Sequence, residues 1–349
     1  MEQNNHLVKL LGKLQVLMMA VAALLACSLV LMVGIEFNVI SFGGETEKGK
    51  PSEVKKSITQ PVQKVGAPDI QGWQAPDTTD IPRTPEGDLV RYGRELIAHT
   101  SVYLGPKGKI KKISNGLNCQ NCHLQGGSIP FGNNFSVTAY SYPKFRSRSG
   151  KSEDIVYRVN GCFERSMNGQ HLDPDSREMK AFIAYFKWMG QGVIKGDKPY
   201  GAGLSKVLLL DRAASPEKGK ELYTKHCALC HGSDGQGVMA PSGLEYIYPP
   251  LYGDHSFNTG AGMYRLMKFA RFIKTNMPLG VTYENPLLTD EECWDIAAYI
   301  NSQPRPVKDL SADWPNIEDK PFDHPFGPFA DKFSEKEHKY GPYQPMLKE

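Results

Sequence analysis

The chain has 349 residues, which is long enough for two compact domains. Its formal net charge is only +3, and Lys and Arg are spread without a long basic block, so the composition excludes a nucleic-acid partner recognised through bulk charge. Hydrophobic residues make up 40% of the chain beside abundant glycine and proline, which indicates a globular protein with much irregular backbone.

The N-terminal segment differs from the rest of the chain. Residues 14–35 carry no charged side chain, and as a helix they would be roughly 33 Å long, enough to cross a bilayer. We expect a cytoplasmic N-terminus at 1–13, an uncleaved transmembrane anchor at 14–37 and a flexible linker at 38–82. The string "LLAC", which ends at Cys27, is loosely similar to a lipoprotein cleavage site and leaves lipidation as the alternative.

One pattern then occurs twice. "TPEGDLVRYGRELI" and "SPEKGKELY" each begin with a hydroxyl cap, Pro and Glu, which is the start signal of a helix. Each is followed by a "CxxCH" string and then by an amphipathic closing helix with apolar residues three and four apart. The sequence therefore predicts a mainly α-helical chain with two similar domains, at residues 83–200 and 215–306. A linker at 201–214 would join them, and an extended C-terminal tail would follow at 307–349.

The two "CxxCH" strings are typical of covalent haem attachment. In each string the two thiols would form thioethers to one haem and the adjacent imidazole would bind its iron. A zinc site would need further Cys/His pairs at close spacing, and these are missing. We therefore expect two haem c groups in two class I cytochrome c-like domains. Haem c is attached outside the cytoplasmic membrane, so we expect both domains in the periplasm. The residues concerned are Cys119, Cys122 and His123, and Cys227, Cys230 and His231.

The sixth ligand of the second haem has several candidates. Met277 in "FIKTNMPLG" precedes a proline that would hold its thioether in place. Lys274 lies three residues earlier, and its neutral amine could also bind iron, although a solvated lysine is an equal reading. Met239 and Met263 are rivals that we expect to be packing residues.

The first haem lacks a matching "NMP" methionine, and Cys162 in "RVNGCFERSMNG" is the candidate instead. Neighbouring cations stabilise a thiolate, which is the form that binds iron. The simpler interpretations of a lone cysteine are a small buried apolar residue and one half of a disulfide. Cys293 is the candidate partner for such a disulfide, but its place in the predicted closing helix of the second domain indicates a core position. The other candidate ligands are Met167, Met179 and Met189.

Four arginines fall in the same segment as this cysteine, at Arg146, Arg148, Arg158 and Arg165. Guanidinium groups suit oxyanions such as sulfonates. Two dianions about 4 Å apart repel by roughly 4 kcal/mol in water, and by more in protein, so a site that joins them needs fixed positive charge.

These motifs, with "SVYLGP" and the tail "DHPFGPFADKFSEKEHKYGPYQPM", resemble the dihaem thiosulfate dehydrogenases over about residues 83–349. The resemblance implies an active-site first haem with His/Cys ligation and an electron-transferring second haem with His and either Met or Lys. It also implies a substrate pocket lined by Arg148, Arg158 and Ser166. The predicted anchor is a departure, since many members are soluble.

We therefore expect a membrane-anchored enzyme that oxidises two thiosulfate ions to tetrathionate, with electrons leaving through the second haem to a c-type cytochrome or a membrane redox partner. Tetrathionate reduction as the main direction is one alternative. A pure electron carrier, in which Cys162 only tunes the first haem, is another. A sulfur-carrier haem subunit is the third.

Overall fold

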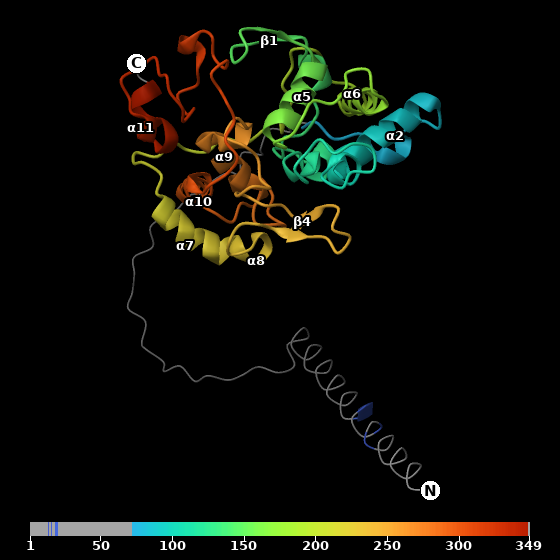
Figure 1. The fold of residues 1–349 in the computed structure, drawn as a ribbon, viewed down its shortest axis with the longest axis horizontal. Helices are drawn as coiled ribbons and strands as arrows, with labels where there is room; N and C mark the ends of the chain where they lie inside the picture. The colour runs from blue at the N-terminus through green and yellow to red at the C-terminus, as the bar shows by residue number, and fades with distance from the viewer. Residues whose placement is uncertain (1–12, 14, 16–17, 20–71, 348–349) are drawn as a thin grey trace, which may run out of the picture. The chain divides into compact units, whose positions relative to one another are not determined.

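The computed structural model describes residues 72–347, together with residues 13, 15 and 18–19, and the chain divides into two compact units, Met1–Val65 and Gly66–Glu349 (Figure 1). The few described residues of the first unit are helical. Within the described residues, no helix is both long enough and apolar enough to cross a membrane. The predicted anchor at 14–37 falls almost entirely outside these residues and stays a prediction.

The second unit is mainly helical and contains two haem-attachment domains in tandem, as the sequence predicts. The first domain surrounds its own apolar core. Its principal elements are α2 (Pro85–Ala98), α3 (Thr100–Leu104), α4 (Leu124–Gly127), the antiparallel strands β1 (Lys144–Arg146) and β2 (Lys151–Glu153), α5 (Ile155–Arg165) and α6 (Arg177–Met189). The second domain has a separate core. Its elements are α7 (Pro216–His226), α8 (Ala228–His231), the antiparallel strands β3 (Val238–Met239) and β4 (Tyr246–Tyr248), α9 (Leu266–Asn276) and α10 (Asp290–Ser302).

The predicted helix starts are confirmed in both domains. The hydroxyl of Thr84 accepts a hydrogen bond from the Gly87 amide at 3.2 Å, and that of Ser215 accepts one from the Lys218 amide at 3.2 Å. In each helix a proline occupies the first turn, where its missing N–H costs no hydrogen bond.

The opening and closing helices of each domain cross at a glycine. A Cβ on Gly93 of α2 would lie 2.1 Å from the Ala181 carbonyl oxygen of α6, and one on Gly219 of α7 would lie 1.8 Å from the Asp295 carbonyl oxygen of α10. No side chain fits at such distances, so the two backbones can touch only at glycine. The same contact in both domains shows that the repeat seen in the sequence is structural.

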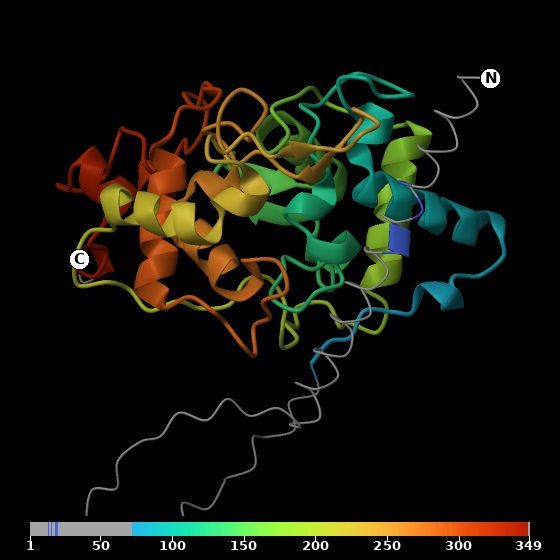
Figure 2. The ribbon, with the colours of Figure 1, turned by 90° about the horizontal axis from the view of Figure 1, so that it is seen from below.

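The two domains lie side by side and meet through polar groups (Figure 2). The β3–β4 hairpin reaches the first domain, where the Asn118 amide donates to the Glu245 carboxylate at 2.9 Å. The Asn258 amide donates to the Glu164 carbonyl at the end of α5 at 2.9 Å. The Asn276 amide, from the end of α9, donates to the Phe131 carbonyl at 3.1 Å.

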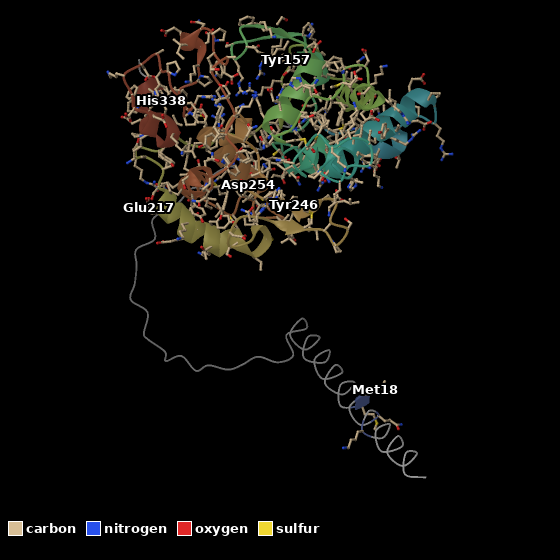
Figure 3. The ribbon with its side chains drawn as sticks, in the orientation of Figure 1. Met18, Tyr157, Glu217, Tyr246, Asp254 and His338 are labelled. Atoms are coloured by element: carbon tan, nitrogen blue, oxygen red, sulfur yellow. The ribbon has the colours of Figure 1, made fainter. Side chains whose placement is uncertain are left out.

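The C-terminal tail packs over both domains, through Asp313 to Arg165 of the first and through Asp323 to Arg265 of the second. It includes α11 (Glu335–Tyr340), a short helix with a Ser334/Glu337 capping box, where the sequence pattern suggests only extended chain. His338 of α11 is almost fully buried within the tail itself, where its Nδ1 donates to the Phe322 carbonyl at 2.6 Å and the Phe329 ring stacks on its imidazole. In the view of Figure 3, His338 and Tyr157 of α5 both lie in the upper part of the unit. Asp313, at the start of the tail, forms ion pairs with the first domain.

Candidate functional site: two haem-attachment sites

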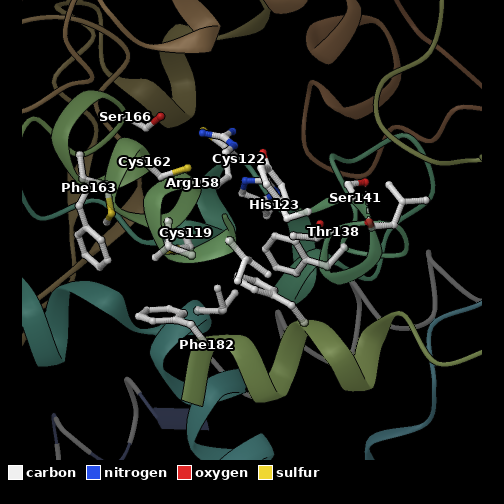
Figure 4. Close-up of a pocket in the computed structure, with 18 of the residues that line it drawn as sticks. Cys119, Cys122, His123, Thr138, Ser141, Arg158, Cys162, Phe163, Ser166 and Phe182 are labelled. Atoms are coloured by element: carbon white, nitrogen blue, oxygen red, sulfur yellow. Dashed lines mark hydrogen bonds between the residues drawn. The ribbon is translucent and has the colours of Figure 1, made fainter. Parts of the chain in front are cut away.

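Helix α5 presents a polar face to a cavity in the first domain. Asp154 caps the helix by accepting a hydrogen bond from the Tyr157 amide at 2.7 Å. Arg158, Cys162 and Ser166 follow at intervals of four residues, so they share one face, and Ser166 forms the C-cap. Figure 4 shows all three side chains around the same cavity.

The first "CxxCH" string lies on the wall opposite Cys162. The Nδ1 of His123 donates to the Asn133 carbonyl at 2.6 Å, which leaves Nε2 as the free nitrogen toward the cavity. The Phe135 ring stacks on the imidazole, with 4.5 Å between the centroids. Burial lowers the pKa of His123 to about 4, so the imidazole is neutral and keeps the lone pair that a metal ligand needs.

The cavity between these walls fits a haem c. Its volume is about 270 Å³. Cys119 and Cys122 supply two thiols at one side, His123 supplies a free imidazole nitrogen, and the remaining wall is mostly apolar, which suits a flat hydrophobic macrocycle. The apolar wall includes Ile97, Leu117, Val137, Phe163, Phe182 and Phe186.

Arg158 is the cation that faces Cys162. Attraction to the Cys162 sulfur in its thiolate form is the largest influence on the Arg158 guanidinium and raises its pKa, while burial opposes this. Tyr142 also lines the cavity and lies close enough to Arg158 to contribute to this rise in its pKa. The arrangement therefore keeps a positive charge beside the sulfur, as the sequence suggests for a thiolate.

Of the other three predicted arginines, Arg146 also lines the cavity, whereas Arg165 and Arg148 lie elsewhere. Arg165 makes a two-point ion pair with Asp313 of the tail, with both N···O distances at 2.8 Å. The Arg148 Nε lies 3.8 Å from the same carboxylate, and its guanidinium donates to the Gly260 carbonyl. Arg148 lines a groove of about 980 Å³ that shares Arg146 and Arg158 with the cavity, and it is not on the cavity wall itself.

The second "CxxCH" string forms a similar arrangement in the second domain. The Nδ1 of His231 donates to the Pro249 carbonyl at 2.8 Å, which leaves Nε2 free. Burial lowers the pKa of this histidine and raises that of Cys227 to about 12. With Cys230 three residues after Cys227, the chain provides the donors that a second haem c requires.

The two candidate ligands for the sixth position of the second iron have different surroundings. Met277 is half-buried directly after α9 and packs against the core of the second domain. The Lys274 amine forms an ion pair with Asp290 at 2.8 Å and donates to the Leu288 carbonyl at 2.8 Å. Lys274 must therefore break both contacts before it can bind iron, whereas Met277 breaks none.

The other methionines considered as iron ligands, and Cys293, differ in how far their side chains are buried. Cys293 is fully buried in α10, as predicted for a core residue. Met179 and Met189 are fully buried in α6, and Met263 packs on the second core, whereas Met239 is 44% exposed. Met167 is the exception, because it is buried and also lines the Cys162 cavity.

Comparisons with known proteins match both domains. Residues 109–194 match the family described as "SoxA/TsdA, cytochrome c domain", and residues 216–304 match the family described as "Cytochrome c". The chain is 40% identical to a thiosulfate dehydrogenase from Psychrobacter arcticus over 69% of this chain and 71% of that protein. It is 36% identical to one from Allochromatium vinosum over 65% of this chain and 82% of that protein.

The chain belongs to the thiosulfate dehydrogenase family. It is accordingly an oxidoreductase with two haem c groups, one in each cytochrome c domain. A solved structure of a thiosulfate dehydrogenase, TsdBA, from Marichromatium purpuratum agrees in fold with a TM-score of 0.62 and 32% identity. The match covers 68% of this chain and half of that one.

Sequence reasoning missed two residues that shape the first site. Tyr142 lies close to Arg158 but is twenty residues before Cys162, outside any helical repeat that would link them. Asp313 pairs with two arginines from a tail that has no periodic pattern. A lone acidic residue in a tail gives no sequence signal of such a role.

Proposed function

We propose that this protein oxidises two thiosulfate ions to one tetrathionate ion at the first haem site. Two dianions enter, one S–S bond forms between their outer sulfur atoms, and two electrons leave. A haem c, when bound, supplies one-electron redox chemistry at each site, and two such sites match a two-electron reaction.

The observation that carries this proposal is the face of α5, where Arg158, Cys162 and Ser166 point into one cavity opposite the haem-attachment cysteines. The Arg158 guanidinium would bind sulfonate oxygens through its paired N–H donors. The Ser166 hydroxyl would donate to another oxygen. The soft sulfur of Cys162 would act both as iron ligand and as the neighbour of the reacting sulfur. Arg148 would add positive charge from the adjoining groove.

We propose His123 with Cys162, and His231 with Met277, as the ligands of the two irons. Lys274 would replace Met277 only after losing its contacts with Asp290 and Leu288. Electrons would leave through the second domain to a c-type cytochrome or a membrane redox partner. The anchor at 14–37 would hold both domains at the periplasmic face of the cytoplasmic membrane.

The test is steady-state turnover with thiosulfate and a one-electron acceptor, with tetrathionate measured as product. We expect the full protein to form one tetrathionate for every two electrons accepted. Cys162→Gly, with both haems still attached, should lose this turnover, and Cys162→Met should keep a six-coordinate first haem with a higher potential, since a thioether stabilises ferric iron less than a thiolate. Near-normal turnover in Cys162→Gly would favour a pure electron carrier with no sulfur chemistry at this position.

The same assay run with tetrathionate and an electron donor measures the reverse direction. Faster reduction than oxidation at equal driving force would make tetrathionate reductase the better description. The site residues would stay the same, because both directions share one transition state.

A further inference from the structure

The β1–β2 hairpin forms part of the wall of the first haem cavity. It precedes α5 in the chain, and Figure 1 shows it beside α5 and the C-terminal tail. Lys144 and Arg146 of β1 both line the Cys162 cavity. They are two residues apart on one strand, so their side chains leave the same face of the hairpin. The hairpin therefore presents two cations to the cavity that also receives Arg158 from α5.

Neither cation of β1 is neutralised by direct contact with a carboxylate. Within the described part of the chain, Lys144 and Arg146 form no ion pair and no side-chain hydrogen bond. Glu153 lies opposite Lys144 in the strand register, but its carboxylate accepts a hydrogen bond from the Ser149 hydroxyl at 2.7 Å. Lys151, the residue opposite Arg146, carries a like charge. The positive charge that β1 brings to the cavity is therefore available to a bound anion.

The C-terminal tail holds the hairpin in this position. The Trp314 amide donates to the Arg148 carbonyl at 2.7 Å, and the Arg148 guanidinium lies over the Trp314 ring, 5.7 Å from its centroid. At the turn, Gly150 packs so closely on Pro315 that a Cβ there would lie 2.6 Å from the proline ring. These contacts are made by the turn of the hairpin, so its position at the cavity does not depend on the side chains of β1.

Arg146 also lies where the cavity meets the adjoining groove. Arg146 and Arg158 are the two residues that line both spaces. One guanidinium group comes from β1 and the other from α5. An anion that moves between the groove and the cavity therefore passes both of them.

Joining two thiosulfate dianions requires two sites for sulfonate groups, because the ions repel strongly at contact distance. Arg158 and Ser166 would hold one sulfonate. We propose that Lys144 and Arg146 form a second oxyanion subsite, which holds the sulfonate of the other thiosulfate, or the far sulfonate of tetrathionate. The paired N–H donors of an arginine suit a sulfonate, and a lysine adds a point charge beside it. This inference rests on the proposed function and adds the place of the second substrate.

The test uses the full protein with both haems attached and compares Arg146→Gln and Lys144→Gln with Lys180→Gln. Lys180 is an exposed lysine of α6 that lines neither space, so its substitution removes a charge elsewhere on the same domain. The probe is tetrathionate added to the fully oxidised protein, where it binds without being reduced because ferric haems have no electron to give. We expect its Kd, measured by calorimetry at low salt, to rise about tenfold in each subsite variant, because one unit charge beside the anion is lost. Lys180→Gln should stay within about twofold of the native Kd.

Turnover provides a second readout. KM for thiosulfate should rise by a similar factor in Arg146→Gln and Lys144→Gln, and the changes in KM and Kd should both shrink at high ionic strength, since salt screens the interaction. Lys144→Arg keeps the charge and should stay within about twofold of the native values. The visible spectra of both haems should match those of the native protein in every variant, because none of the substituted residues is a candidate iron ligand.

The outcomes distinguish the subsite from the proposed function. If the native protein oxidises thiosulfate but Arg146→Gln and Lys144→Gln bind tetrathionate as tightly as Lys180→Gln, the second subsite is refuted and the proposed function stands. If Lys144→Arg binds as weakly as Lys144→Gln, a charge role for Lys144 is refuted. A native protein that binds tetrathionate through these cations without oxidising thiosulfate would overturn the proposed oxidation alone. One that neither binds tetrathionate nor oxidises thiosulfate would overturn both.

Discussion

Arg158 and Arg165 lie on the same helix. Removing the charge of Arg158 should reduce activity, whereas removing the charge of Arg165 should reduce stability. Arg158 forms no ion pair with any residue that the structure describes, and it lies one helical turn from Cys162 on the face of α5 that lines the cavity. Arg158→Gln should therefore remove a buried partner of the substrate anion, a loss of about 2 to 4 kcal/mol that lowers kcat/KM roughly 30- to 1,000-fold. The free energy of unfolding should fall much less than in Arg165→Gln, because no ion pair with a carboxylate is broken.

Arg165→Gln should instead destabilise the fold. It removes two charge-assisted hydrogen bonds of 2.8 Å and leaves Asp313, whose side chain is 9% exposed, with only the 3.8 Å contact to Arg148. Breaking one partner of a buried ion pair costs about 3 to 5 kcal/mol. Enzyme that remains folded should keep a kcat/KM within a few-fold of the native value.

The assays are thiosulfate turnover per haem at saturating acceptor and reversible chemical denaturation followed by circular dichroism. The reasoning would be refuted by an Arg158→Gln variant with native kcat/KM, or by an Arg165→Gln variant with native stability. It would also be refuted by Arg158→Lys matching the native enzyme, because a lysine keeps the charge and loses the paired N–H geometry.

Two further predictions follow from the second domain and the N-terminus. Met277→Gly should lower the potential of the second haem and slow electron exit while leaving substrate binding unchanged, and an unchanged ferrous spectrum would assign the ligand to another residue. A chain lacking residues 1–40, exported by a cleavable signal, should be soluble and active, whereas release of the native protein by a mild salt wash would contradict the anchor.

Local sequence signals were sufficient to predict the opening and closing helices of each domain. The caps at Thr84 and Ser215 are made by neighbouring residues, so the sequence contains all that their formation requires. Helix α5 was not expected, although Asp154 is a good cap for it. Its apolar residues Val159 and Phe163 are buried, while Arg158, Cys162 and Ser166 face the cavity, and this obscures the pattern of a helix with a solvated outer face.

The four arginines around Cys162 show that proximity in sequence does not determine which side chains reach the same site. Arg158 and Arg165 are seven residues apart and share a helix face, but seven residues place them about 10 Å apart along the axis. One therefore lies at the cavity and the other reaches Asp313 in the tail. Asp313 is 148 residues from Arg165 in the chain, and only the path of the tail over the first domain brings the two side chains together.

Polar contacts at the domain boundary explain how two domains with separate apolar cores keep their relative position. No common apolar core spans them, since each has its own cluster of buried side chains. Their relative position depends instead on directional contacts, and one of these links the ligand loops of the two sites. The Asn276 amide, next to Met277, donates to the Phe131 carbonyl, two residues before the Asn133 carbonyl that orients His123. A displacement of one domain against the other must break this hydrogen bond or shift a loop that holds a candidate iron ligand. The geometry of each haem site is therefore coupled to the arrangement of the two domains.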